Sequence, residues 1–179
     1  MHIVGTLDWQ PALDHPELLA PRVKDAIAEL ELECFVAAID PNRADTAEFC
    51  AAYGVPLEVS ANCVVVAGRR AELSVMAACL VRATDRADVN RVIRKRLDVR
   101  KISFAGMDEA VRESGMEYGG ITPIGLPHTW PILVDEVVAG LDMIVVGSGI
   151  RGSKIAMPGI SAANLPNAEI LALALRSAD

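Results

Sequence analysis

Residues 63–81 read Cys-Val-Val-Val-Ala-Gly-Arg-Arg-Ala-Glu-Leu-Ser-Val-Met-Ala-Ala-Cys-Leu-Val. The β-branched run over 63–67 predicts one strand, and the long apolar run over 72–81 predicts a second strand that returns antiparallel to it. Residues 68–70 are expected to form the turn between the two strands. Because both runs are almost continuously apolar, we expect this hairpin to lie in a sheet that is covered on both faces.

The segments on either side of the hairpin alternate irregularly between short helices and short strands. Helical spacing of apolar residues predicts the helices, and short apolar runs predict the strands. Helices are expected over residues 17–30, 45–54, 85–99, 108–114 and 167–175, and strands over 3–7, 34–39, 101–105, 130–134, 143–146 and 154–157. This order predicts a single α/β (α+β) domain over residues 1–179 with a mixed sheet.

The composition fits one compact domain and disfavours several classes of protein. The chain has 179 residues, 52% of them hydrophobic and 23% charged, so a disordered or low-complexity chain is excluded. Aromatic residues make up 4% of the chain, which disfavours a binder of single-stranded nucleic acid because base-stacking platforms are scarce. The net charge of −7 predicts that the protein as a whole is repelled by phosphate backbones and anionic membranes.

The cysteines predict a reduced, cytoplasmic protein. Cys34, Cys50, Cys63 and Cys79 lie 13 to 16 residues apart without a Cys-x-x-Cys pair, which favours packed thiols over disulfides or a zinc site. The first residues show no basic segment followed by an apolar stretch, and the longest uncharged apolar run, 73–81, is too short to span a bilayer. We therefore expect neither a membrane contact nor a targeting signal.

A local excess of positive charge lies in and around the predicted helix over 85–99. Residues 82–101 contain eight basic and three acidic side chains, so this window contrasts with the acidic remainder of the chain. Two interpretations remain open, a solvated helix face or a patch that faces the phosphates of a nucleic acid. In the second interpretation Arg91, Arg94 and Lys95 would contact the nucleic acid.

Two glycine-rich segments are candidates for ligand binding. Gly147-x-Gly149-x-x-Gly152 matches the dinucleotide-binding fingerprint, but too few residues separate it from Pro158 for the helix that this fingerprint needs. We interpret it as a turn between two strands whose amides could face a substrate oxygen. Residues 119–123, Gly-Gly-Ile-Thr-Pro, can present backbone N–H groups to a carbonyl or a developing oxyanion, and a tight structural turn is the alternative.

Other catalytic motifs are not found. The sequence has no G-x-S-x-G nucleophile elbow, no H-E-x-x-H zinc motif and no Walker loop. His128, beside the second glycine-rich segment, is expected to be a surface residue, and Asp135 and Glu136 could bind an amine or simply cap a strand end. Chemistry that depends on a catalytic triad or a bound metal is therefore disfavoured, and we expect no cofactor.

Taken in order, these segments resemble the YbaK/ProX family of aminoacyl-tRNA deacylases, whose domains also occur as editing insertions in prolyl-tRNA synthetases. The resemblance covers about residues 45–157 and is carried by Ala51–Pro56, the hairpin over 63–81, the strand over 101–105 with its following helix, Gly-Gly-Ile-Thr-Pro-Ile-Gly over 119–125, Val134-Asp135-Glu136 and the segment 146–155. It implies a mixed, mostly antiparallel, barrel-like sheet surrounded by short helices.

The resemblance also implies a function, the trans-editing hydrolysis of the ester that joins a wrong, small amino acid to the terminal ribose of tRNA. In this family a loop of the form G-x-x-x-P, matched here by residues 119–123, holds the aminoacyl carbonyl, and substrate hydroxyls help to position the attacking water. The expected site residues are the catalytic Asn62, Gly119, Gly120 and Pro123, the substrate-binding Ile121, Thr122, Asp135, Ser148, Gly149 and Arg151, and the tRNA-binding Arg91, Arg94 and Lys95.

One position departs from the family pattern. The family begins the first strand of the hairpin with a lysine, whereas this chain has Asn62 there, which replaces a fixed positive charge by a neutral donor and acceptor. None of the chain's lysines stands at that position, and Arg151 is a surrogate cation that a neighbouring strand could bring. Three hypotheses follow: an active deacylase, a catalytically silent module that binds tRNA or a small aminoacyl ligand, or a hydrolase of another small ester.

Overall fold

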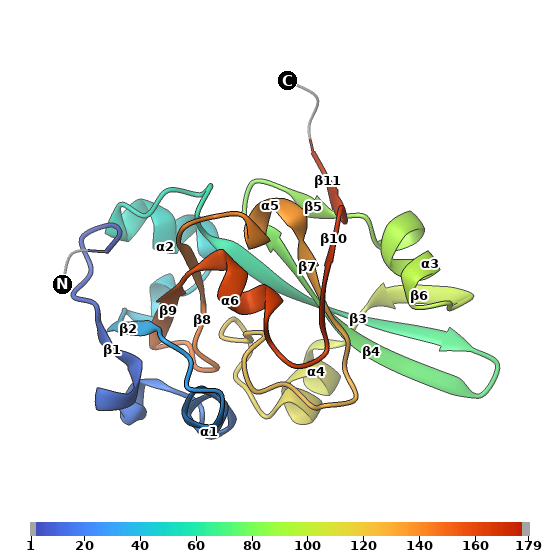
Figure 1. Cartoon of the computed structure of the whole chain (residues 1–179), viewed down its shortest axis with the longest axis horizontal. Coiled ribbons are helices and arrows are strands. Elements are labelled where there is room, and N and C mark those ends of the chain that lie inside the picture. The colour runs from blue at the N-terminus through green and yellow to red at the C-terminus, as the bar shows by residue number, and fades with distance from the viewer. Residues whose placement is uncertain (1–2, 177–179) are drawn as a thin grey trace.

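The computed structural model describes residues 3–176 and consists of short helices around two main sheets (Figure 1). The strands are β1 (Gln10–Pro11), β2 (Phe35–Ala38), β3 (Ala61–Arg70), β4 (Leu73–Arg82), β5 (Arg86–Ala87), β6 (Lys101–Phe104), β7 (Ile132–Asp135), β8 (Ile144–Gly147), β9 (Ser153–Met157), β10 (Ala168–Leu171) and β11 (Ala174–Leu175). The α-helices are α1 (Pro21–Glu29), α2 (Thr46–Tyr53), α3 (Arg94–Arg96), α4 (Met107–Ser114), α5 (Glu136–Ala139) and α6 (Gly159–Ala163). The remaining turns of helix are η1 (Ala12–Asp14), η2 (Pro16–Leu18), η3 (Pro41–Arg43) and the π-helical η4 (Val89–Ile93).

The β3–β4 hairpin lies in a five-stranded sheet with the order β10-β7-β4-β3-β6. The two strands pair antiparallel along the whole of β3, from Ala61 to Arg70, so β3 is longer than predicted, whereas β4 has its predicted length. The turn lies beyond residues 68–70, where Ala71 has a φ of +52°. The pairs β4–β7 and β7–β10 are parallel, and β3–β6 is antiparallel, which confirms the predicted mixed sheet.

A four-stranded antiparallel sheet with the order β1-β2-β9-β8 lies beside the first sheet (Figure 1). The two are joined by a parallel bridge between Ser60, just before β3, and Val145 of β8. There the Val145 N–H donates a hydrogen bond of 2.8 Å to the Val59 carbonyl. The mostly antiparallel α+β fold is confirmed, but the sheets meet at one edge and stay open instead of closing into a barrel.

Different elements cover the two faces of the five-stranded sheet. Val65 and Leu80 belong to the larger core, which also contains Ile27 of α1. Their neighbours along the strands face the other way, because side chains alternate between faces. Accordingly, Val66 packs with Ile93 of η4 in a separate apolar cluster. Both faces are therefore covered, as the continuous apolar runs predicted, and η4 lies on the opposite face from the larger core.

Two elements predicted at the ends of the chain are wrong. Residues 3–7 form no strand, and Gly5 lies in a turn with a φ of +65°. Residues 167–175 form β10 and β11 instead of a helix, and β10 pairs in parallel with β7. Alanine and leucine favour helices in isolation, but pairing with β7 and the complete burial of Leu173 outweigh this preference.

The predicted helices over 17–30 and 85–99 are present but shorter. Helix α1 begins at Pro21, because proline suits the first turn of a helix, and the helical turns after Asp88 end with α3. The Asp88 side chain accepts a hydrogen bond of 3.1 Å from the Arg91 N–H and so caps η4. Among residues 3–176, the helices are too short or too polar to cross a lipid bilayer.

Candidate functional site

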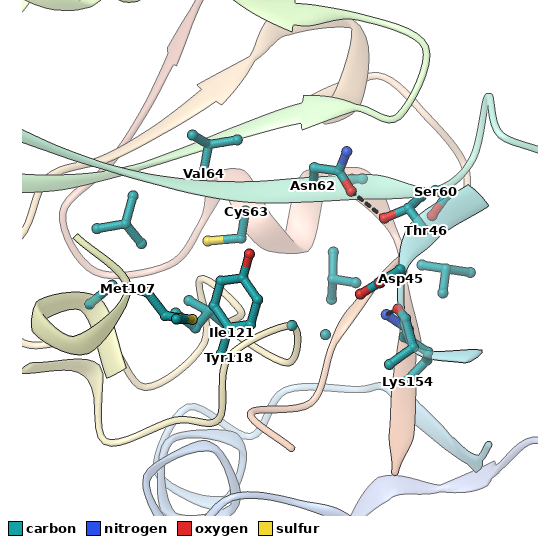
Figure 2. Close-up of a pocket in the computed structure, with 18 of the residues that line it drawn as sticks. Asp45, Thr46, Ser60, Asn62, Cys63, Val64, Met107, Tyr118, Ile121 and Lys154 are labelled. Atoms are coloured by element: carbon teal, nitrogen blue, oxygen red, sulfur yellow. Dashed lines mark hydrogen bonds between the residues drawn. The ribbon is translucent and has the colours of Figure 1, made fainter. Parts of the chain in front are cut away.

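A cavity of about 440 Å³ opens where the two sheets meet. One set of wall residues comes from the start of β3, the region around the start of α4 and the glycine-rich segment over 119–123. The other comes from residues 44–46, at the start of α2, and from the adjoining ends of β8 and β9. Figure 2 shows Met107 and Tyr118 on one side of the cavity and Asp45 and Lys154 on the other. A volume of this size is typical of small-molecule sites.

Asn62, Gly119 and Ile121 are the predicted site residues that line this cavity. The Thr46 hydroxyl, from the first turn of α2, donates a hydrogen bond of 2.7 Å to the Asn62 side-chain oxygen (Figure 2). This bond orients the Asn62 amide and leaves its NH₂ group as a donor. Asn62 therefore supplies a neutral donor at the position where the family pattern has a lysine.

The two glycine-rich segments pack against each other. The Gly149 N–H donates a hydrogen bond of 2.8 Å to the Gly120 carbonyl. A Cβ on Gly120 would lie 2.6–2.8 Å from the backbone of Ile150, and a Cβ on Gly147 would collide with the Gly120 carbonyl. Gly119 has a φ of +80°, and its N–H has no hydrogen-bond acceptor in the part of the chain that the structure describes. That N–H is therefore available to a ligand oxygen.

Arg151, in the glycine-rich segment over 147–152, holds the other glycine-rich segment, over 119–123, close to the start of α2. Its guanidinium donates hydrogen bonds of 3.2 Å to the carbonyls of Tyr118 and Pro41, and Nη2 lies 3.5 Å from the Asp45 carboxylate. Its backbone N–H donates a bond of 2.7 Å to the Glu117 carboxylate. Arg151 does not line the cavity, so the structure places it beside the site as a clamp between two of its walls.

A lysine that was not among the predicted site residues does line the cavity. Lys154 of β9 is 8% exposed, and its Nζ donates a hydrogen bond of 2.9 Å to the Ala44 carbonyl. The same Nζ lies 5.1 Å from the centre of the Phe49 ring. Burial lowers the pKa of Lys154 to about 8. Its sequence signal is a single charged residue within an otherwise apolar strand.

The cysteines are free thiols, and Cys63 is one of the residues that line the cavity. Burial raises the pKa of the Cys63 thiol, and it raises the pKa of Cys34 and Cys79 to about 12. Since the thiolate is the reactive form, these thiols are weak nucleophiles. Between residues 3 and 176, no cluster of three or more histidine, cysteine, aspartate or glutamate side chains is placed to bind a metal.

Three large apolar side chains form an exposed rim around the cavity. Phe104, Met107 and Tyr118 line it, yet they are 65%, 53% and 58% exposed. Exposed aromatic side chains at the mouth of a polar site suit a planar, partly apolar group of a ligand. We call these three residues the apolar rim.

Several other predicted site residues lie outside the cavity lining. The Asp135 carboxylate is fully buried against the C-terminal strands, and the Ser148 hydroxyl is 2.6 Å from that of Ser153. Thr122 is fully buried, and its hydroxyl oxygen has no hydrogen-bond partner among the described residues. Pro123 lines a smaller, separate pocket. These residues shape the surroundings of the cavity without facing into it.

The basic residues Arg91, Arg94 and Lys95 are exposed on η4 and α3. The buried face of η4 packs on the side of the sheet that carries Val66, and the residues that line the cavity include none from η4 or α3. The structure therefore does not bring this basic patch to the cavity. Contact with both would require a ligand that extends beyond the cavity.

The polar groups of the cavity differ in the charge that they can accommodate. Lys154 and the Gly119 N–H are donors, which suit an oxygen with partial negative charge. Asp45 also lines the cavity, and its carboxylate suits an ammonium group. A small ligand that carries both a carbonyl and an amine therefore matches this arrangement.

Comparison with known structures shows the same fold in proteins of low sequence identity. The hypothetical protein APE2540 superposes with a TM-score of 0.76 at 17% identity, covering 86% of this chain and 99% of that chain. A protein described as a candidate trans-editing enzyme for prolyl-tRNA synthetase superposes with a TM-score of 0.72 at 19% identity, covering 86% of this chain and 95% of that chain. A search of curated proteins gives no match.

Comparison with family models extends this result to the sequence. Residues 40–160 match the model of the aminoacyl-tRNA editing domain, a range that includes all of the residues that line the cavity. The match confirms the resemblance that the glycine-rich segments and the hairpin indicated. The chain belongs to the aminoacyl-tRNA editing domain family.

Proposed function

We propose that the protein is an aminoacyl-tRNA deacylase that acts in trans on tRNA carrying a wrong, small amino acid. The observation that carries this proposal is the placement of Lys154, the Gly119 N–H and Asp45 around one cavity. Membership of the editing-domain family supports the reaction class. The likeness to a candidate trans-editing enzyme supports action on tRNA charged by another protein.

The cavity suggests how the aminoacyl ester would be seated. The carbonyl oxygen of the ester would accept a hydrogen bond from the Gly119 N–H. The α-ammonium group of the amino acid would donate to the Asp45 carboxylate. Ala44, Ala61 and Ala110 contribute small side chains to the walls. The space left for the amino-acid side chain therefore suits a small one.

The reaction is the addition of water to the ester. The water oxygen bonds to the carbonyl carbon, and the electron pair of the C=O bond moves to the oxygen, which becomes anionic. Collapse of this intermediate breaks the bond to the ribose oxygen, which takes up one proton of the water, while the second proton passes to solvent and the amino acid leaves as a carboxylate. Oriented donors at the oxyanion and a positioned water supply the rate enhancement in such a site. In this proposal the NH₂ group of Asn62, whose side-chain oxygen accepts the Thr46 bond, would help to position the water.

The experiment that tests the proposed function is a deacylation assay. Purified protein is mixed with a panel of tRNAs that carry alanine, serine or cysteine, and the loss of each ester is followed over time. We expect turnover on at least one mischarged tRNA. Binding without turnover would instead support the silent module, the alternative favoured by Asn62 in place of the family lysine.

The apolar rim predicts where the terminal base of the tRNA binds. Replacing Phe104 by alanine is expected to raise KM by about tenfold with little change in kcat, because base–aromatic stacking contributes about 1–3 kcal/mol per base. The matched control is Leu73→Ala, which removes another exposed apolar side chain, 69% exposed, at the far end of the hairpin. Equal effects of the two substitutions would contradict this role.

The basic patch on η4 and α3 remains a predicted tRNA contact. If it binds phosphates, the Arg91→Ala, Arg94→Ala, Lys95→Ala triple variant should weaken tRNA binding at low salt. The slope of log affinity against log salt should become shallower by about one for each lost phosphate contact. Its kcat at saturating tRNA should equal that of the wild type, because these residues lie away from the cavity. An unchanged salt slope would favour the solvated-face interpretation.

A further inference from the structure

Lys154 is a charged residue in a place where charge is costly. Its side chain comes from the interior of β9, between β2 and β8, and is 8% exposed. The described residues give its Nζ one hydrogen-bond acceptor, the Ala44 carbonyl at 2.9 Å, and no ion-pair partner. An ammonium group has three donors, so two remain for other partners at the cavity.

The environment of Lys154 opposes its charge. Burial is the main cause that lowers its pKa to about 8, and the nearby Arg151 cation acts in the same direction. The Cys50 and Asp45 groups act against this shift, but Asp45 is 68% exposed. The Ala44 carbonyl and the Phe49 ring offset part of this cost. A buried ammonium group without an ion pair still destabilises a fold, and an apolar side chain of similar volume would usually be tolerated better. Stability alone therefore does not explain a lysine here.

Resting on the proposed function, we propose that the Lys154 ammonium group binds the ester carbonyl oxygen and stabilises the negative charge that develops on it. The family pattern has its lysine on the first strand of the hairpin, where this chain has Asn62, and the structure supplies a cation to the same cavity from β9. In this proposal the cation at the cavity comes from β9 and not from the first strand of the hairpin. Asp45, close enough to interact with Lys154, would bind the α-ammonium group of the substrate.

A cation at the carbonyl oxygen contributes more as the reaction proceeds. When water adds to the carbonyl carbon, the oxygen gains the electron pair of the C=O bond and becomes fully anionic. In a buried site the attraction between this oxyanion and a fixed ammonium group is larger than in water. The ammonium group keeps its protons throughout, and one proton of the water goes to the departing ribose oxygen.

The sign of the pH dependence follows from the groups around Lys154. The titratable and charged groups nearest to it are Asp45 and Cys50, from the cap and body of α2, and Arg151, from the turn before β9. With a lowered pKa, Lys154 is protonated below about pH 8 and loses its charge above it. Turnover should therefore fall as the pH rises through this region.

The test compares two analogues of the substrate by isothermal titration calorimetry, which keep the α-ammonium group and differ in the charge at the carbonyl position. One is adenosine esterified at the 3′ position with 1-aminoethylphosphonate, whose anionic phosphonate resembles the tetrahedral intermediate. The other is 3′-alanylamido-3′-deoxyadenosine, whose amide carbonyl is uncharged. Lys154→Met should weaken binding of the phosphonate by about 100-fold, the usual loss for one oxyanion donor, and binding of the amide by less than about threefold. Lys24→Met, which removes a half-exposed lysine on α1 that is outside the cavity lining, is the matched control and should change neither.

Two further measurements separate this role from a structural one. Lys154→Met should lower kcat for deacylation by about 100-fold and remove the loss of activity near pH 8. It should also raise the free energy of unfolding at pH 7, because the folded state opposes the lysine charge below its pKa. Equal weakening of both analogues together with lower stability would show a structural lysine and overturn the proposal.

The remaining outcomes distinguish this inference from the proposed function. If the wild type deacylates tRNA and Lys154→Met does so at the same rate, the role of Lys154 is wrong and the deacylase function stands. If the wild type binds the phosphonate through Lys154 but hydrolyses no member of the panel, the deacylase function is wrong and the oxyanion contact stands. If the wild type binds neither analogue, both proposals are overturned.

Discussion

Replacing Gly119 by alanine is expected to lower kcat/KM for deacylation by about 10³. Gly119 has a φ of +80°, which L-residues rarely adopt, and a Cβ there would collide with the Arg151 guanidinium. The backbone or the guanidinium must shift, so the Gly119 N–H moves away from the ester oxygen and the clamp from Arg151 to the Tyr118 carbonyl is disturbed. Misplacement of about 1 Å can cost a factor of about 10², and loss of an oxyanion donor costs a similar factor.

The control for this variant is a glycine in an unstrained position. Gly140 ends α5 with a φ of −86°, and an added Cβ would make only ordinary contacts, at 3.5 Å or more, with two carbonyl oxygens of its own helix. We expect Gly140→Ala to retain wild-type kcat/KM. A Gly119→Ala variant that folds, binds tRNA and deacylates as fast as Gly140→Ala would show that the Gly119 N–H does not hold the ester oxygen.

The second large effect is expected on stability, at Asp135. Replacing Asp135 by alanine should lower the free energy of unfolding by about 3–5 kcal/mol, the range for breaking a buried ion pair. Its fully buried carboxylate accepts hydrogen bonds from the backbone N–H groups of Val137, Leu173 and Ala174, and from the Arg176 guanidinium at 2.8 Å. It therefore ties the C-terminal strands to the end of β7.

Denaturant unfolding measures this loss of stability. A control variant and a measurement of KM show whether its cause is the buried ion pair. Glu136→Ala removes an exposed carboxylate 3.5 Å from the same arginine and should change the free energy of unfolding by less than about 1 kcal/mol. The sequence suggested that Asp135 binds substrate. Under that role Asp135→Ala would raise KM and leave stability almost unchanged, which would contradict the structural role derived from its hydrogen bonds.

The fold could be predicted from the sequence where local pattern and tertiary structure agree. The valine-rich run of β3 and its apolar return strand predict a hairpin, because no other regular structure suits β-branched residues so well. The segment over 167–175 shows the opposite case. Its alanines and leucines favour a helix, and only the position of β7, distant in sequence, makes it a strand.

The candidate site could be predicted only in part, for a similar reason. Glycine-rich segments are visible in the sequence, so Gly119 could be named as a candidate, and the family pattern pointed to Asn62; both line the cavity. Lys154 was missed because its place at the cavity depends on the pairing of β9 between β2 and β8. Strand pairing over long sequence separations leaves little local signal, so a lone lysine in an apolar strand is the one indication available.

The junction of the two sheets has a consequence for how this cavity can diversify. One wall rests on β3 and α4 and the other on α2 and β9, and the two ladders are joined by the bridge between Ser60 and Val145. Each wall has its own strand ladder, and the bridge, the Thr46–Asn62 hydrogen bond and the Arg151 contacts link the two. A substitution that alters the side chains of one wall and keeps these links leaves the register of the other unchanged, so this architecture can evolve new substrate sizes one wall at a time.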